Sequence, residues 1–246
     1  MRRALPLLLL LLLWSAPAGA AEPLVADLTS HFVAITTGFT GADVVLFGAT
    51  DGPGDVVVVV RGPGRDAVVW RKSRVAGVWM NTRQVTFAGA PSYYAVYSTR
   101  PLDEIMPPAM RLLNDIGIAD LRLAAAEKDR SPQEIAEFRD ALIRQRRQAA
   151  LYAEAVGGFN FLGGELFHLA LGFPAAVPTG NYTVQIFLVR DKRVVGGQTS
   201  PLYISQAGID AEVDDFAERR ALSYGLLAVA GAALVGWLSS LPFRHA

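Results

Sequence analysis

The 246-residue sequence contains no cysteine. This absence excludes a disulfide framework, a zinc–thiolate site, an iron–sulfur cluster, a cysteine nucleophile and a lipid carried on an N-terminal cysteine. The chain also lacks an excess of charge, because 23 basic residues balance 23 acidic ones, and nucleic acid is therefore not an expected partner. With 52% hydrophobic residues, the chain is too apolar to be disordered, and its length fits one or two domains.

Lysine and histidine are both scarce. Three of the 23 basic residues are lysine, and this arginine bias, beside abundant alanine, glycine, valine and proline, indicates a GC-rich bacterial genome. His31 and His168 are far apart in the sequence, and both fall in runs that predict strands. A metal pair or a catalytic base is the alternative at these positions, but we expect structural histidines. We therefore expect no bound metal and no cofactor.

The N-terminus has the pattern of a secretory signal peptide over residues 1–20. Two arginines precede an apolar run from Leu5 to Trp14, and Ala18-Gly19-Ala20 supplies the small residues of a cleavage site. We expect cleavage after Ala20. The alternative is an uncleaved anchor, which is disfavoured because the run is about half of the roughly 20 residues that cross a bilayer.

A second apolar segment, residues 221–243, carries no charge and is long enough to span a membrane. It has no polar face, which favours a transmembrane helix over a buried core helix. Residues 207–220 would form a stalk, and residues 244–246 a cytoplasmic tail. The stalk is acidic but lacks the spaced oxygen ligands of a calcium loop (Asp210, Glu212, Asp214, Asp215 and Glu218). The sequence thus predicts a single-pass inner-membrane protein whose larger part faces the periplasm.

Small residues recur every four positions in the expected transmembrane helix, at Ala228, Ala232, Gly236 and Ser240. Such a ridge lets a second membrane helix approach closely. An alanine-rich helix also produces this spacing by composition alone. We interpret the four residues as a candidate helix-packing ridge, with another membrane protein as the partner.

Residues 21–101 predict β-structure. Short β-type runs recur about every ten residues between glycine and proline turns, as in an all-β sandwich (31–36, 43–47, 55–60, 67–70, 77–80, 84–87 and 93–97). The five valines Val56–Val60 do not alternate with polar residues, so we expect burial on both faces. Gly52-Pro53-Gly54 and Gly62-Pro63-Gly64 flank this run, but no lysine–serine or lysine–threonine pair follows either, so they predict turns rather than a phosphate loop.

Residues 102–155 predict helices. A short helix opens after Pro101, and Gly117 is expected to end the first helical stretch. Ser131-Pro132-Gln133-Glu134 starts another, with serine as the cap and glutamate able to close a capping box. Its apolar stripe continues towards Gly157-Gly158 (Ile135, Phe138, Leu142, Ala149 and Tyr152). Four arginines lie largely off the stripe, and we interpret them as a solvated face rather than an anion or partner site (Arg139, Arg144, Arg146 and Arg147).

Residues 156–206 return to β-type runs (159–161, 166–171, 180–189, 194–195 and 201–204). The strands after the helices are few for an independent domain. We therefore predict a mainly β fold, in which residues 21–101 and 156–206 form one immunoglobulin-like β-sandwich ectodomain with an α-helical insertion at residues 102–155. Two separate domains are the alternative.

Five stretches are distinctive as text: Phe39–Asp43, Leu46–Ala49, Gly54–Pro63, Phe138–Ile143 and Gly180–Asp191. They resemble the alphaproteobacterial predicted-transmembrane-protein family, and the similarity extends over nearly the whole chain. The resemblance implies a signal peptide, an exported domain and a C-terminal anchor, and it supplies no functional residues. It also implies, loosely, permeases of the sulfite-exporter type as a partner class.

The charge and motif content favour a binding module. Residues 21–219 contain 19 basic and 23 acidic residues, a net charge of −4, which argues against anionic lipid or nucleic acid as a partner. No nucleophile elbow, carboxylate pair or dinucleotide fingerprint is visible, so we do not expect an enzyme. The leading hypothesis is a periplasmic binding or accessory domain that acts through protein contacts. A dedicated transporter subunit and an envelope enzyme are the alternatives, and the sequence identifies no small-molecule ligand.

Overall fold

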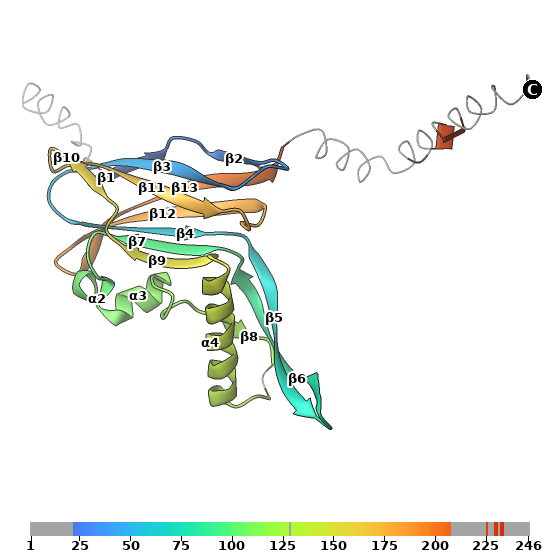
Figure 1. The fold of residues 1–246 in the computed structure, drawn as a ribbon. Helices are drawn as coiled ribbons and strands as arrows, with labels where there is room; N and C mark the ends of the chain where they lie inside the picture. The colour runs from blue at the N-terminus through green and yellow to red at the C-terminus, as the bar shows by residue number, and fades with distance from the viewer. Residues whose placement is uncertain (1–21, 128, 208–224, 226–228, 231, 234–246) are drawn as a thin grey trace, which may run out of the picture.

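A computed structural model of the protein describes residues 22–127, 129–207, 225, 229–230 and 232–233 (Figure 1). Sheet A contains, in order, β1 (Leu24–Leu28), β3 (Gly41–Thr50), β11 (Leu166–Pro174) and β10 (Asn160–Leu162). Sheet B contains, in order, β2 (Phe32–Ile35), β13 (Arg193–Gln206), β12 (Gly180–Arg190), β4 (Asp55–Arg61), β7 (Tyr94–Ser98) and β9 (Tyr152–Val156). The mainly β prediction is confirmed, and each of these sheets takes strands from both sides of the helical segment.

Sheets A and B face each other across the main hydrophobic core, as the stacked layers in Figure 1 show. The five valines of β4 have no exposed surface. Alternate valines face sheet A, and the others face α2 (Leu102–Ile105) and α3 (Pro108–Asn114), which lie on the opposite side of sheet B. The prediction that this run is buried on both faces is confirmed.

The two Gly-Pro-Gly segments lie where the chain turns at the ends of β4. Gly52-Pro53-Gly54 connects β3 to β4, and the Arg190 side chain donates a 2.8 Å hydrogen bond from Nε to the carbonyl of Pro53. Gly62 and Pro63 connect β4 to β5 (Gly64–Val75). Both segments are therefore strand connections, as predicted.

The third sheet, sheet C, projects from the sandwich as a long hairpin. It contains β5, β6 (Val78–Pro91) and the short β8 (Ala124–Ala125). The three predicted runs at 67–70, 77–80 and 84–87 thus belong to two long strands. The loop between these strands is Ala76-Gly77, whose φ angles of 50° and 86° fit the two-residue turn that matches the twist of a hairpin.

The amphipathic helix α4 (Pro132–Gln148) packs on one face of the hairpin and encloses a second, smaller core. The buried residues of this core come from both elements (Ala67, Val69, Val85, Phe87 and Ala90 from the hairpin, Phe138 and Leu142 from α4). The Ser131 hydroxyl accepts a hydrogen bond from the Glu134 backbone N–H, as the predicted cap requires. The Glu134 carboxylate, however, pairs with Arg83 and Arg130.

The predicted end of this helix is wrong. The helix ends at Gln148, and Tyr152, which fits the apolar stripe, lies in β9 and pairs with Tyr94 of β7. Ala150 adopts the left-handed conformation, with φ 55°, and the Leu151 N–H donates to the carbonyl of Arg146. Glycine usually fills this terminating position, so the sequence pointed instead to Gly157-Gly158. The first helical stretch likewise ends early, at Asn114, with Asp115 at φ 51°.

The predicted membrane segments fall mostly outside the described residues. This applies to the signal peptide, to residues 208–220 of the stalk and to most of residues 221–243. Among the described residues, no helix combines the length and the apolar character that crossing a bilayer demands. Of the candidate ridge, Ala232 is described as helical and exposed, whereas Ala228, Gly236 and Ser240 lie outside the described part of the chain.

Candidate binding surfaces

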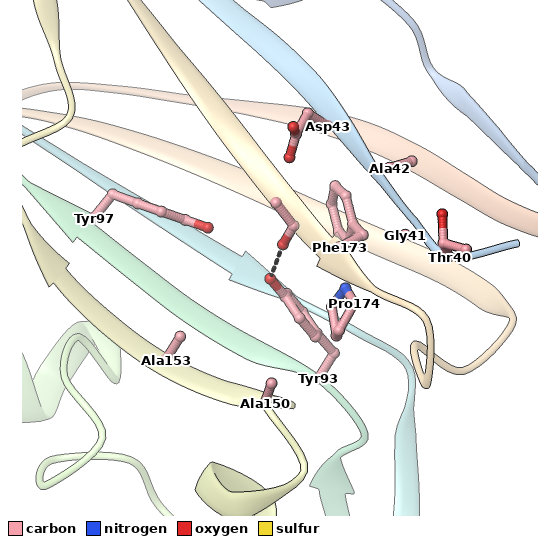
Figure 2. Close-up of a pocket in the computed structure, with 11 residues that line it drawn as sticks. Thr40, Gly41, Ala42, Asp43, Tyr93, Tyr97, Ala150, Ala153, Phe173 and Pro174 are labelled. Carbon is pink, nitrogen blue, oxygen red and sulfur yellow. Dashed lines mark hydrogen bonds between the residues drawn. The ribbon is translucent and has the colours of Figure 1, made fainter.

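An open cleft of about 520 Å³ lies at the edge of the sandwich, where sheets A and B diverge (Figure 2). The start of β3 contributes Asp43, β7 contributes Tyr97, and β11 contributes Gly172 and Phe173. Tyr93, just before β7, donates a 2.8 Å hydrogen bond from its hydroxyl to the carbonyl of Gly172, which Figure 2 shows as a dashed line. The cleft thus combines aromatic walls with a few polar atoms.

The tyrosines of this cleft stay protonated at physiological pH. Burial raises the pKa of Tyr93 far above its ordinary value and also raises the pKa of Tyr97. Tyr93 further packs its ring 5.4 Å from the ring of Phe173. Asp43 is the only carboxylate among the residues that line the cleft, and these residues include no histidine or lysine. These groups can donate and accept hydrogen bonds, but they do not form a nucleophile with its base.

His31 meets Ser200 and Asp27 in an arrangement that only superficially resembles a catalytic triad. Its Nε2 atom lies 3.2 Å from the Ser200 hydroxyl and 3.1 Å from the Asp27 carboxylate. A triad requires the serine on one ring nitrogen and the carboxylate on the other, because the base must be oriented while it accepts a proton. Here both partners share one nitrogen, and Ser200 itself lies 3.3 Å from Asp27. These contacts join the β1–β2 connection to β13.

His168 lies on the outer side of sheet A, two strands away from Asp27. The strand register pairs Phe47 of β3 with Asp27 of β1 on one side and with His168 of β11 on the other. Two strand spacings amount to roughly 10 Å, and the Phe47 ring lies 6.0 Å from the His168 ring. This separation is too long for His168 and Asp27 to share a metal ion. No group of three or more metal-binding side chains converges among the residues that the structure describes.

The outer side of sheet A exposes an apolar surface, which we call the sheet A face. It consists of Val25, Phe47, Leu162 and Leu166, each between 51% and 62% exposed. These side chains border a shallow groove of about 300 Å³ whose only ionisable lining residues are Asp27 and His168. A one-sided antiparallel sheet normally presents polar side chains outward. Among the described residues, no helix covers this side, in contrast to sheet B (Figure 1).

The sequence contains a partial signal for the sheet A face. Val44–Phe47 is a continuous apolar run like that of β4, and Leu24-Val25 breaks alternation in the same way. Such a run indicates a strand that is apolar on both faces. The run does not reveal whether the second face of the strand is covered by a helix, as in β4, or is exposed, as in β3. The exposed side chains of β1, β3 and β11 come together only because these strands, distant in sequence, pair in sheet A. Local sequence patterns do not reveal that pairing.

The predicted arginine face of α4 is partly structural. Arg139 donates to the carbonyl of Leu121, which anchors the loop before α4. Arg144 and Arg147 are exposed beside Asp140. The arginines therefore divide between loop anchoring and a solvated face, and they do not converge on one point.

Comparison with known families matches residues 23–245 to the family described as "Putative transmembrane protein (Alph_Pro_TM)". No curated protein matches the chain. The match covers the sandwich, the hairpin with its helix, and the charge-free segment after them. The chain therefore belongs to the alphaproteobacterial transmembrane protein family that its sequence resembles.

Proposed function

We propose that this protein is a membrane-anchored binding or accessory module whose β-domain acts in the periplasm through contact with another membrane protein. The sheet A face carries this proposal. Val25, Phe47, Leu162 and Leu166 come from four neighbouring strands and border one groove, so together they form a continuous surface. Contiguous exposed apolar patches on folded domains commonly mark sites of protein contact.

The chemistry of the cleft supports a binding role over catalysis. Its tyrosine hydroxyls have raised pKa values, and neither a second carboxylate nor a histidine lines it with which Asp43 could share a proton. An enzyme site would gather several perturbed acids, bases or nucleophiles in a concave pocket. The cleft fits a recognition surface that uses aromatic contacts and hydrogen bonds.

Membership of a transmembrane family supports the anchored arrangement. Along the sequence, the described domain lies between the signal-peptide pattern at residues 1–20 and the charge-free segment at 221–243. In this topology the domain faces the periplasm of the inner membrane, and residues 244–246 face the cytoplasm. A partner in the same membrane is then held at a high effective concentration.

Affinity purification of the tagged full chain from gently solubilised membranes tests the proposal. Replacing Phe47 and Leu166 together by serine should abolish recovery of the partner, because both removed side chains are exposed and apolar. Val195→Ser, which also replaces an exposed apolar side chain by serine but on β13, is the control and should keep the partner. Equal recovery of the partner with both variants would refute a role for the sheet A face.

A further inference from the structure

The β5–β6 hairpin extends beyond the helix that supports it. Its base packs against α4 through Ala67, Val69, Val85 and Phe87, all buried. Beyond this core, residues 72–81, which we call the hairpin tip, have no buried side chain. Figure 1 shows the hairpin reaching past the end of α4, away from the sandwich.

The hairpin tip is apolar where a solvated turn would be polar. Val78 and Trp79 are 63% and 68% exposed, and Val75 and Met80 are about half exposed. The register places Val75 opposite Val78 and Arg74 opposite Trp79. Four large apolar side chains therefore gather within three residue pairs of the Ala76-Gly77 turn.

The same hairpin is locally basic. The sequence has no acidic residue between Asp66 and Asp103, a stretch that includes the whole hairpin tip. Arg71 and Arg83 nearer the base pair with Glu137 and Glu134 of α4. Lys72 and Arg74 form no ion pair with the described residues, although Arg74 Nε donates to the carbonyl of Gly77. The net charge of residues 21–219 is negative and argues against an anionic partner for the domain as a whole. The hairpin tip, however, is locally basic.

We propose that the hairpin tip docks on the surface of an anionic lipid bilayer. Tryptophan is favoured at the boundary between headgroups and acyl chains, and lysine and arginine are attracted to anionic headgroups. Val75, Val78, Trp79 and Met80 enter the interface, while Lys72 and Arg74 contact lipid phosphates. Docking fixes the orientation of the domain on its membrane, which goes beyond the proposed protein contact on sheet A.

A bilayer is within reach of the tip. Thirteen residues, 208–220, separate the described domain from the expected transmembrane segment, and an extended chain of that length spans up to about 45 Å. In the view of Figure 1, the end of β13 and the hairpin tip both lie on the right-hand side of the molecule. The proposal places the membrane surface along that side of the molecule.

Tryptophan fluorescence of the full chain in vesicles tests the proposal. After removal of the signal peptide, the tryptophans are Trp70, Trp79 and Trp237. One chain keeps only Trp79 and another keeps only Trp70, with phenylalanine at the other positions. Each is reconstituted into phosphatidylcholine vesicles, with or without an equal part of phosphatidylglycerol, and brominated acyl chains serve as quenchers.

We expect quenching of Trp79 in the phosphatidylglycerol vesicles and much weaker quenching of Trp70. Trp70 is five residues before Val75, which places it about 17 Å behind the turn along the strand. Lys72→Gln with Arg74→Gln should lower the ratio of docked to undocked domain by roughly 25-fold, because each basic residue near an anionic surface contributes about five-fold. High salt should have the same effect on Trp79 quenching.

A reporter on another surface completes the experiment. Leu113 of α3 is 70% exposed, and a Leu113→Trp chain without the native tryptophans should show no quenching. The proposal is overturned if Trp79 is quenched no more than this reporter, or if its quenching ignores phosphatidylglycerol. The proposal is also overturned if the environment of Trp79 changes only when a co-purified protein is added to the vesicles, because the tip would then contact protein rather than lipid.

Discussion

Nη1 of Arg83 lies 2.9 Å from Oε1 of Glu134, so an ion pair connects β6 to the first turn of α4. Arg83 is 55% exposed, and such pairs contribute at most about 1 kcal/mol to stability. The second core beneath this pair includes Phe138, which is buried, and its ring lies 5.1 Å from the guanidinium carbon of Arg71. Apolar burial, rather than the ion pairs, should hold α4 against the hairpin.

Phe138→Ala should therefore lower the free energy of unfolding by about 3–5 kcal/mol, because it leaves a cavity in a small core. Arg83→Gln should cost less than about 1 kcal/mol. Chemical denaturation of the two variants under the same conditions measures both changes. A loss from Arg83→Gln as large as the loss from Phe138→Ala would contradict the dominance of apolar burial over the ion pairs.

The turn of the hairpin carries a residue that is strained by its own Cβ atom. Ala76 has φ 50°, a conformation that asparagine and glycine adopt more easily than alanine. Ala76→Asn should stabilise the hairpin by about 1 kcal/mol. Slower hydrogen exchange of amides near the turn would report this gain, whereas faster exchange would contradict the assigned turn. Ala88→Asn on the body of β6 is the control and should bring no such gain, because Ala88 lies outside the turn.

Acid should weaken the attachment of the loop after α3. The Arg122 side chain hydrogen-bonds to the Asp115 carboxylate and, with Arg61 nearby, lowers the pKa of Asp115. A carboxyl whose pKa is lower in the folded state stabilises the fold above its unfolded pKa of about 4 and loses this effect as the pH falls further. The free energy of unfolding should decrease as the pH falls below about 4.

Asp115→Asn isolates the contribution of this carboxyl. Asparagine tolerates the left-handed backbone found at this position, so the turn should persist. The variant should be less stable than the wild type at neutral pH and should lose less stability on acidification. Denaturation curves over the acidic range compare the two slopes, and parallel curves would exclude Asp115 as a source of the pH dependence.

Local patterns predicted the elements well where one interaction dominates. The buried valines of β4 and the Ser131 cap of α4 are confirmed, since burial and capping are properties of short segments. The end of α4 was not predictable in the same way. The terminating left-handed conformation is usually found at glycine, but here Ala150 adopts it. Tyr152 matches the helical stripe by spacing alone, and its parallel pairing with Tyr94 depends on residues far away.

The candidate surfaces were less predictable than the strands. The net charge of residues 21–219 does not reveal that Lys72 and Arg74 lie together at an exposed turn. Likewise, the sequence around Phe47 predicts a core residue, but the register of β3 places Phe47 opposite His168 of β11 on the exposed face that it shares with Leu166. Both features depend on which face of a strand is left uncovered, and that is decided by tertiary packing.

The candidate ridge of the expected transmembrane helix stays a prediction. Gly236→Leu should leave membrane insertion intact, because leucine is favourable in lipid, but it should block close approach of another helix. Crosslinking in membranes should show loss of the complex in this variant, while Leu234→Ile should retain it. Retention of every crosslinked partner by Gly236→Leu would mean that the small residues at 228, 232, 236 and 240 reflect composition only.

Site-specific photocrosslinking in intact cells tests the central claim, that the sheet A face binds another membrane protein. A photoreactive phenylalanine analogue at Leu166 of the full chain reports on the sheet A face, and the same analogue at Val195, an exposed position of β13, serves as the control. The account predicts a discrete crosslinked product from Leu166 that Phe47→Ser suppresses, with no such product from Val195. Absence of a product at Leu166, or the same product from both positions, would contradict it.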